Sequence, residues 1–264
     1  MNRFAATIIL LAVTFVSCYK AEVIPFRKVS KPPKGCNASS FYGQSYAEEG
    51  DPFHGFTKQY DSEGRVTEVV APMFSLVLAD SIRMRLVYYD HEVKFVNNAN
   101  PADTVLTAVF NNQGRLIRLN GNSAYEFATT EYNYTSNRLS SIQVAGITMN
   151  FVYDSKGNVI RFESDNEGGL DNFEFQYDLS VKVTSQLYID YVAGWIYNTF
   201  TLSQIMNWTP DLSPRNKRTH TRILFNKTEP WYDVEFTDHT FDADGRLTSY
   251  LAGGYKMYET WNCK

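Results

Sequence analysis

The side chains that could carry out chemistry in this 264-residue chain are few and widely separated. Its four histidines are His54, His91, His220 and His239. No two of them have the HxxxH spacing that places two imidazoles on one helix face to hold zinc. The sequence also lacks a GxSxG nucleophile elbow, a glycine-rich phosphate loop and a dinucleotide-binding fingerprint. The histidines could therefore form a site only if the fold brings them close together.

Acidic residues near the C-terminus are the second chemical candidate. They are Asp233, Glu235, Asp238, Asp242 and Asp244. The phrase FDADG resembles a calcium loop, which needs oxygen ligands at alternate positions and a closing Glu. Here Arg246 and Leu247 follow Gly245, so the phrase predicts a hairpin turn, and we expect neither a metal nor another cofactor. A glycosidase needs two carboxylates at the right separation, and the sequence leaves that reaction open.

A short phrase recurs along the chain and indicates how these residues are positioned. Its copies, YDSEGRV, FNNQGRL, YTSNRL, YDSKGNV and FDADGRL, begin at Tyr60, Phe110, Tyr134, Tyr153 and Phe241. Asp or Asn at the first turn position hydrogen-bonds the backbone ahead of it, and a later Gly or Asn accepts a positive φ. Each phrase predicts a type I turn with a G1 bulge between two antiparallel strands. The residues expected at positive φ are Gly64, Gly114, Asn137, Gly157 and Gly245.

Between the turns, apolar residues alternate with polar ones as in half-buried strands. In one example, Ile147, Met149 and Phe151 alternate with Thr148 and Asn150. The phrases repeat every 20 to 24 residues or so, which is one hairpin, if YDLSVKV around Val181 counts as a turn that has lost its Gly. On the order of 12 to 14 strands would follow, too many for an open sheet that does not curl. The predicted fold class is all-β: one strongly curved antiparallel hairpin meander, open or closed like a barrel.

One apolar insert interrupts the alternation. It is YVAGWIYNTFTLSQIMNW, residues 191–208, in which Trp195, Leu202 and Ile205 recur at helical intervals. This spacing predicts a short helix or a packed loop. Beside a curved sheet such an insert would plug or cover the concave side. It would be a core element or, alternatively, a ligand lid in which Trp195, Phe200 and Trp208 contact the ligand.

The N-terminus predicts export. Arg3 precedes an apolar run of about 13 residues, shorter than the roughly 20 that span a bilayer as a helix. We therefore predict a signal peptide at residues 1–17, a basic, Pro-containing tether and lead-in at 18–54, and a β domain at 55–264. Removing residues 1–17 takes away one of the 25 basic residues and leaves 24 against 29 acidic ones. This balance argues against a nucleic-acid partner.

The end of the signal carries a resemblance to a modification site. Residues Phe15 to Cys18, FVSC, resemble the lipobox of bacterial lipoproteins, in which the Cys is acylated and becomes the new N-terminus. The alternative is an ordinary signal peptide with an incidental Cys. With Cys18 assigned to lipid, Cys36 and Cys263 remain, and an even number in an exported protein favours a disulfide. Two free thiols are the alternative.

The turn phrases also resemble YD repeats, the β-hairpin units of Rhs and teneurin-type shells. Together with the lipobox-like FVSC, the basic tether, the insert followed by SPRNK and the last FDADGRL, they resemble a family of small Bacteroidota lipoproteins of unknown function with a porin-like fold. The resemblance covers most of residues 55–262. It implies a lipid anchor in the outer membrane, on the periplasmic or the cell-surface face, and it supplies no catalytic residues.

Export, turn-built strands and the missing catalytic motifs favour a non-enzymatic scaffold in the envelope that binds a protein, a glycan or an apolar ligand. One alternative is a carrier that holds an apolar ligand in the concave face of the sheet. Another is a glycan hydrolase. Inward-facing packed Phe, Tyr and Leu would indicate the scaffold, an open apolar cavity the carrier, and two carboxylates across a groove the hydrolase.

Overall fold

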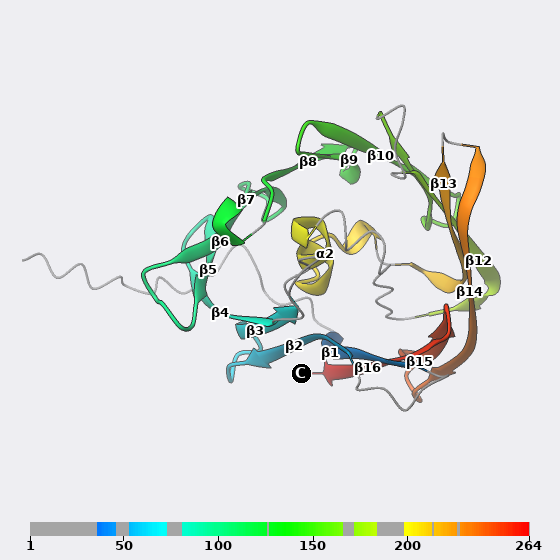
Figure 1. Cartoon of the computed structure of the whole chain (residues 1–264), viewed down its shortest axis with the longest axis horizontal. Helices are drawn as coiled ribbons and strands as arrows, with labels where there is room; N and C mark the ends of the chain where they lie inside the picture. The colour runs from blue at the N-terminus through cyan, green and yellow to red at the C-terminus, as the bar shows by residue number, and fades with distance from the viewer. Residues whose placement is uncertain are drawn as a thin grey trace, which may run out of the picture.

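The recurring turn phrases join neighbouring strands of one sheet, and this sheet closes on itself (Figure 1). The structure is a computed structural model that describes residues 36–45, 53–72, 81–125, 127–165, 172–183, 198–212, 214–225 and 228–263. Within these ranges, sixteen antiparallel strands follow one another around a barrel, and β1 pairs with β16. The predicted all-β, curved antiparallel sheet is confirmed, and it has more strands than the expected 12 to 14.

The elements follow the chain in simple order. The strands are β1 (Cys36–Ser45), β2 (Phe53–Tyr60), β3 (Val66–Pro72), β4 (Ser81–Tyr88), β5 (Glu92–Asn97), β6 (Thr104–Phe110), β7 (Leu116–Gly121), β8 (Thr130–Thr135), β9 (Arg138–Val144), β10 (Ile147–Tyr153), β11 (Val159–Ser164), β12 (Asn172–Lys182), β13 (Asn216–Phe225), β14 (Glu229–Phe241), β15 (Leu247–Ala252) and β16 (Tyr255–Cys263). The helical segments are η1 (Ser123–Tyr125), α2 (Asn198–Ile205) and η2 (Pro210–Leu212).

Two details of the expected organisation differ. The barrel starts at Cys36, so β1 and the first residues of β2 belong to it although the predicted boundary was residue 55. Val181 does not lie in a turn, because β12 continues to Lys182 and its pairing with β13 shifts between Asp178 and Lys182. Without a Gly to take positive φ, this phrase forms an irregularity in a long strand.

Four of the hairpin turns share one hydrogen-bond pattern. In the turn after β2, Asp61 Oδ1 accepts hydrogen bonds from the N–H groups of Glu63 and Arg65, and the Gly64 N–H donates to the Asp61 carbonyl. Asn111, Asp154 and Asp242 repeat the pattern. The residues expected at positive φ, Gly64, Gly114, Asn137, Gly157 and Gly245, have φ of 80°, 76°, 69°, 89° and 76°. A local side chain and a left-handed residue thus fix these four reversals. The fifth phrase, YTSNRL, differs from the expected type I turn. Ser136 and Asn137 both have positive φ, 50° and 69°, between the paired residues Thr135 and Arg138, which is a two-residue turn of type I′ geometry.

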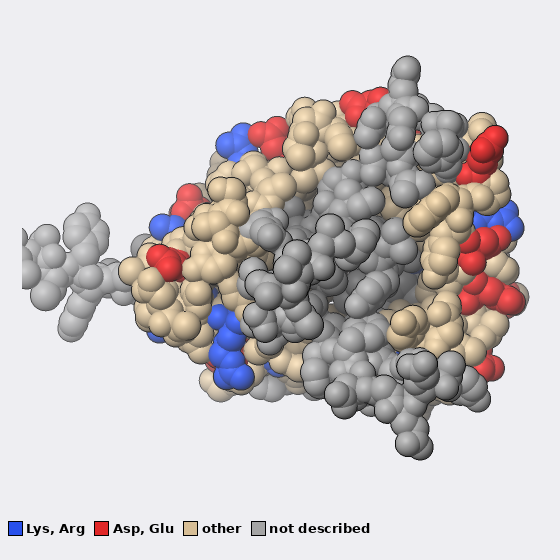
Figure 2. All heavy atoms as spheres, viewed as in Figure 1, with Lys and Arg blue, Asp and Glu red and all other residues tan. Residues whose placement is uncertain are grey.

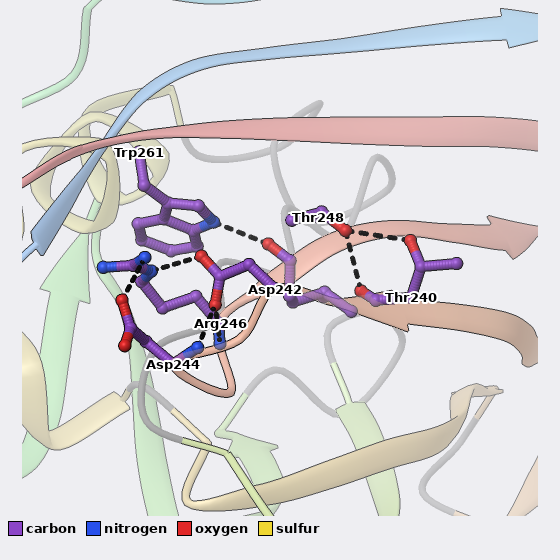
Figure 3. A network of polar contacts seen from close by, with 7 residues as sticks. Thr240, Asp242, Asp244, Arg246, Thr248 and Trp261 are labelled. Atoms are coloured by element: carbon purple, nitrogen blue, oxygen red, sulfur yellow. Dashed lines mark hydrogen bonds and ion pairs between the residues drawn. The ribbon is translucent and has the colours of Figure 1, made fainter.

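In three turns the residue four positions after the Asp also binds its carboxylate. Arg65 Nε donates to Asp61 Oδ2 at 2.7 Å, and Arg246 donates in the same way to Asp242, as Figure 3 shows. Asn158 takes this position beside Asp154. Burial alone would raise the pKa of these three carboxyls, but the backbone and side-chain hydrogen bonds outweigh burial and lower it. The FDADG carboxylates therefore hold a turn.

Aromatic side chains connect successive hairpins at this same end of the barrel. The Tyr153 hydroxyl donates to the Leu139 carbonyl at 2.7 Å, and the Trp261 indole N–H donates to the Leu247 carbonyl at 2.6 Å (Figure 3). Three more bonds of this kind run from Tyr88 to Val66, from Tyr134 to Leu116 and from Tyr177 to Val159. Four of the acceptors are the first residue of a strand that follows a turn, and Leu139 is the second residue of β9. In the bonds of Tyr134, Tyr153 and Tyr177, the aromatic residue of one turn phrase therefore meets the aliphatic residue of the preceding phrase.

Gly157→Val is expected to lower the free energy of unfolding by about 1 to 2 kcal/mol, because a β-branched residue at φ 89° is strained. Its Cβ would also lie 3.2 Å from side-chain atoms of Arg138 and Arg215. Ser155→Ala in the same turn is the control and should be nearly neutral. Urea unfolding of both variants measures this, and a Gly157→Val protein as stable as wild type would contradict the assigned turn.

Apolar side chains fill the inside of the barrel and charged ones cover its outside. On β4, Ile82, Met84 and Leu86 are buried, whereas Arg83 and Arg85 are exposed. Cross-strand ion pairs lie on the outer surface and join Arg118 to Glu131, Arg161 to Glu174 and Arg222 to Asp233. The alternation follows from the two-residue period of a strand.

The described part of the predicted insert, residues 198–208, lies inside the ring of strands (Figure 1). We call residues 198–212, which include α2 and η2, the plug. Leu202, Met206 and Leu212 pack in the main core, whereas Ile205 packs in a second cluster with Phe56, Phe236, Leu247, Tyr250 and Met257. The plug therefore contacts both clusters of the core. In the part of the chain that the structure describes, no helix is long and apolar enough to cross a membrane.

Polar groups fix the plug to opposite walls. Asn207, with φ 55°, ends α2, and the bonds from Asn207 N to Gln204 O and from Trp208 N to Ser203 O form a Schellman motif. Lys58 Nζ on β2 donates to the Ile205 carbonyl at 2.8 Å. On β9, the Leu139 N–H donates to Asp211 Oδ2 at 3.1 Å.

Lys58 is 8 % exposed, and burial lowers the pKa of its ammonium to about 7. Between pH 7 and 10.5 the unfolded chain holds this proton and the folded protein releases it, so higher pH favours the folded state. Relative to Lys58→Met, the wild type is expected to gain about 1 to 2 kcal/mol of unfolding free energy from pH 7 to pH 9. Denaturant titrations at both pH values measure the difference, and an equal pH response in both proteins would show that Lys58 keeps its ordinary pKa.

Candidate functional site

The barrel wall opens between β13 and β14. Their pairing runs from Phe225 and Glu229 to His220 and Glu235 and ends there. Beyond the pair of His220 with Glu235, the two strands pair with their other neighbours. Asn216 and Lys217 pair with β12, and residues of β14 from Phe236 to Phe241 pair with β15. An irregularity between Thr237 and Thr240, with Asp238 at φ 49°, bends β14 at the opening. The two strands thus separate toward the turn end of the barrel.

A pocket of about 600 Å³ fills this opening, and we call it the wall pocket. Its lining comes from three neighbouring strands: Gln176 and Val181 of β12, Lys217, Thr219 and His220 of β13, and Glu235, Phe236, Thr237, Asp238, His239 and Phe241 of β14. The lining mixes carboxylates, an ammonium group, hydroxyls, an amide and imidazoles with three apolar side chains. The volume is within the usual range for small-molecule sites.

His239 is half-buried in the pocket wall, and its ring lies nearly parallel to that of Phe241, with 8° between the planes and 6.2 Å between the centroids. Burial is the main cause that lowers the pKa of His239 to about 4, and the ammonium of Lys217 lowers it further. A hydrogen bond with the Arg218 backbone acts in the opposite direction. His239 is therefore neutral at pH 7, with one ring nitrogen as a donor and the other as an acceptor.

Charged groups of both signs surround the pocket, and the carboxylates outnumber the ammonium groups. Lys217 Nζ lies 3.1 Å from Asp178 Oδ2, and hydrogen bonds and this ion pair lower the pKa of Asp178 to about 2. Lys256 Nζ donates to the Asp238 backbone carbonyl at 3.2 Å. Two ammonium groups therefore stand beside the carboxylates of Asp178, Glu235 and Asp238. On the surrounding outer surface, acidic side chains gather over β12 to β14, at the right of Figure 2.

The fold brings together residues that the sequence named separately. His220 and His239, and with them Glu235 and Asp238, line the same pocket. Among the described residues, no three His, Cys, Asp or Glu side chains could share a metal ion. Asp233 pairs with Arg222, and Asp242 and Asp244 bind Arg246. His91 lies near Asp90 in another turn, and His54 is on β2.

The sequence did not predict the wall pocket as a unit. Thr219, Thr237 and Gln176 carried no signal in the sequence, because they resemble ordinary outward-facing strand residues. The bend of β14 at Asp238 is also unmarked by Gly or Pro.

The other named residues lie elsewhere. Cys18 and Trp195 are outside the described residues, and Phe200 is in α2. The Trp208 ring makes edge-to-face contacts with the rings of Phe95 and Phe110, at ring-centroid distances of 5.6 and 5.2 Å. This places Trp208 in the core, away from the wall pocket. Cys36 and Cys263 face each other in the β1–β16 pair, while the disulfide itself stays a prediction.

Comparison with known proteins identifies relatives of the fold. No protein-family model and no curated protein matches the chain. A porin-like protein from Bacteroides uniformis ATCC 8492 is similar in structure, with a TM-score of 0.57 and 17% identity, over 85% of this chain and 98% of that one. A porin-like protein from Bacteroides vulgatus ATCC 8482 has a TM-score of 0.54 and 11% identity, over 86% and 98%. At these identities the likeness establishes the porin-like fold alone.

Proposed function

We propose that this protein is a lipid-anchored envelope protein that acts as a non-enzymatic binding scaffold. The observation that carries the proposal is the plug, which packs the described part of the lumen against Phe, Leu and Tyr side chains of the strands. A packed interior leaves a rigid wall on which a binding site can be held, and the wall pocket is such a site. The packed interior argues against a carrier of an apolar ligand, which would need an open apolar cavity.

The outer surface supports a barrel that stands in water beside the membrane. Transmembrane barrels turn apolar side chains to the lipid and polar ones to the lumen. Here Arg83, Arg85 and the pair of Arg161 with Glu174 face outward. The membrane link would then come from an acyl group on Cys18, which the lipobox-like FVSC supports.

Native mass spectrometry of the protein from envelope extracts tests the scaffold. The expected mass is that of the acylated chain without a further lipid in the lumen. A stoichiometric apolar ligand in addition to the anchor would contradict the packed interior and favour the carrier.

Cys18→Ala tests the anchor. Because acyl chains supply the membrane affinity, the wild type is expected in the membrane fraction and the variant in the soluble fraction of lysed cells. Cys36→Ala, which leaves Cys18 in place, is the control and should stay with the membrane. Equal membrane retention of wild type and Cys18→Ala would contradict lipidation.

A further inference from the structure

The arginines of the turn phrases differ in whether their own turn neutralises them. Arg65 and Arg246 bind the Asp carboxylates of their turns. Arg115 and Arg138 belong to FNNQGRL and YTSNRL, two phrases without an acidic residue. In the ranges that the structure describes, neither of these two guanidinium groups forms an ion pair or donates a hydrogen bond. Their charge is therefore available to another group.

The phrase YDSKGNV brings a further arginine to the turn end of the barrel from a distant part of the chain. Asn158 stands where other phrases have Arg, it is fully buried, and its Nδ2 donates to Asp154 Oδ2 at 2.8 Å. Its Oδ1 accepts hydrogen bonds from the N–H groups of Arg215 at 2.8 Å and Asn216 at 3.1 Å. Asn158 thus holds the residues that begin β13 beside the β10–β11 turn. Arg215 is placed over that turn as a result.

Two guanidinium groups converge on Gly157. Arg138 Nη2 and Arg215 Nε each lie 3.2 Å from the position that a Cβ on Gly157 would take. The Arg138 guanidinium lies over the Tyr153 ring, 4.5 Å from its centroid, and the Tyr153 hydroxyl is held by the Leu139 carbonyl. Stacking uses the face of a guanidinium and leaves the N–H groups at its edge to donate. Two sets of donors are therefore positioned beside one glycine.

Positive charge exceeds negative charge at this place. Lys156, which precedes Gly157, is exposed and adds a third cation to Arg138 and Arg215. The carboxylates here are Asp154 and Asp211. Asp154 already accepts hydrogen bonds within its own turn, and Asp211 accepts one from the backbone N–H that follows Arg138. Because like charges held close together repel each other, a bound anion would stabilise this arrangement.

We propose that Arg138 and Arg215 bind a phosphate group over Gly157, with Lys156 adding positive charge. Guanidinium groups from two different parts of the chain fit an anion with terminal oxygens on several sides of one centre, which a phosphate has and a planar carboxylate lacks. Arg215 is exposed, so the phosphate can be part of a larger molecule. This proposal goes beyond the scaffold function, because it uses neither the wall pocket nor the packed lumen.

Two sources share this chemistry, a soluble phosphate ester and the headgroup of a membrane lipid. The chain enters the barrel at Cys36, which pairs with Cys263 at the end of β16. Trp261 near that end binds Leu247, directly after a turn phrase, so Cys36 lies at the turn end as well. An acyl anchor upstream of Cys36 would lead to the end of the barrel that carries Arg138 and Arg215.

An experiment with two arms tests the proposal and identifies the source. In the first arm, glycerol 3-phosphate, inorganic phosphate and succinate are titrated calorimetrically into the full-length protein in mild detergent, above the second phosphate pKa of about 6. In the second arm, full-length Cys18→Ala protein is sedimented with phosphatidylcholine vesicles that contain phosphatidic acid. Vesicles given the same surface charge by a fatty acid are the carboxylate control.

Phosphate is expected to bind more tightly than carboxylate in at least one arm. A preference for glycerol 3-phosphate or inorganic phosphate over succinate supports the site with a soluble ligand. A preference for phosphatidic acid alone supports the site with a lipid headgroup. Absence of a preference for phosphate in both arms would overturn the proposal.

Variants locate the binding. Arg215→Gln should fold normally, because Arg215 is exposed, and should weaken phosphate binding about tenfold or more through loss of charged hydrogen bonds. Arg138→Gln should weaken it as well, but it also loses the contact with Tyr153, so Arg215→Gln is the decisive variant. Arg83→Gln, an equal change of charge at an exposed position of β4, is the control and should bind within about twofold of wild type. Equal affinity of wild type and Arg215→Gln would refute the site.

Failure of this site and failure of the scaffold are distinguishable. The scaffold is tested by the mass of the extracted protein and by the fractionation of Cys18→Ala, and neither measurement depends on Arg138 or Arg215. If phosphate does not bind while those two tests succeed, the scaffold stands and the phosphate site falls.

Discussion

Reduction of a Cys36–Cys263 disulfide is expected to lower the free energy of unfolding by about 4 kcal/mol. The two residues are register partners on β1 and β16. Facing residues of antiparallel strands have Cα atoms about 4.5 to 5.5 Å apart, within the range that a disulfide spans. The bond would close nearly the whole barrel into one loop, and in the chain-entropy model such a long loop gives roughly 4 to 5 kcal/mol.

Urea unfolding with and without reductant measures this effect, with circular dichroism to check that the β signal of the native state is kept. The control is the double variant Cys36→Ser and Cys263→Ser, whose stability should not respond to reductant. Two freely alkylatable thiols in protein purified from an oxidising compartment would contradict the disulfide.

Trp208→Ala is expected to lower the free energy of unfolding by about 2 to 3 kcal/mol. Trp208 follows α2 and contacts Phe95 and Phe110 on the far wall, so its loss leaves a cavity between plug and barrel. The value lies below that for a fully buried Trp because Trp208 is half-buried. We also expect an apolar fluorescent probe to bind the variant more strongly than the wild type, because the plug loses an anchor.

Trp231→Ala is the matched control for Trp208. Trp231 lies on β14 and is 58 % exposed, so its removal should change stability by no more than about 0.5 kcal/mol. The comparison uses thermal and urea unfolding of both variants. Similar stability of Trp208→Ala and Trp231→Ala would show that the plug contributes little to the fold.

The turns and the insert could be predicted from the sequence because the signals for them are short-range. Each turn is encoded within a few residues, by a side chain such as Asp61 and a left-handed residue such as Gly64, so no distant contact is needed to recognise it. The helical spacing of Leu202 and Ile205 placed α2 correctly, and both side chains are buried. Alternation then indicated which strand faces were inside.

Features that depend on contacts between distant parts of the chain could not be predicted from short-range signals. β1 was assigned to the lead-in because CNASSFYGQS shows little apolar alternation and follows the Pro-containing tether. Its place is fixed by pairing with β16 at the other end of the chain. The wall pocket depends on where the β13–β14 register stops and where Asp238 bends the strand, and no residue type marks either position.

The position of the plug in the chain sets an order of events during folding. Almost every strand pairs with its neighbour in sequence, so most contacts are local and can form early. The β1–β16 pair is the exception, because it joins residues at opposite ends of the barrel domain and carries the highest loop-closure entropy. The plug lies between β12 and β13, so we expect it to pack inside the curved sheet before this seam closes. We therefore expect pairing of β1 with β16 to be the last step of folding. A disulfide between Cys36 and Cys263 would then form only after the plug has packed inside the barrel.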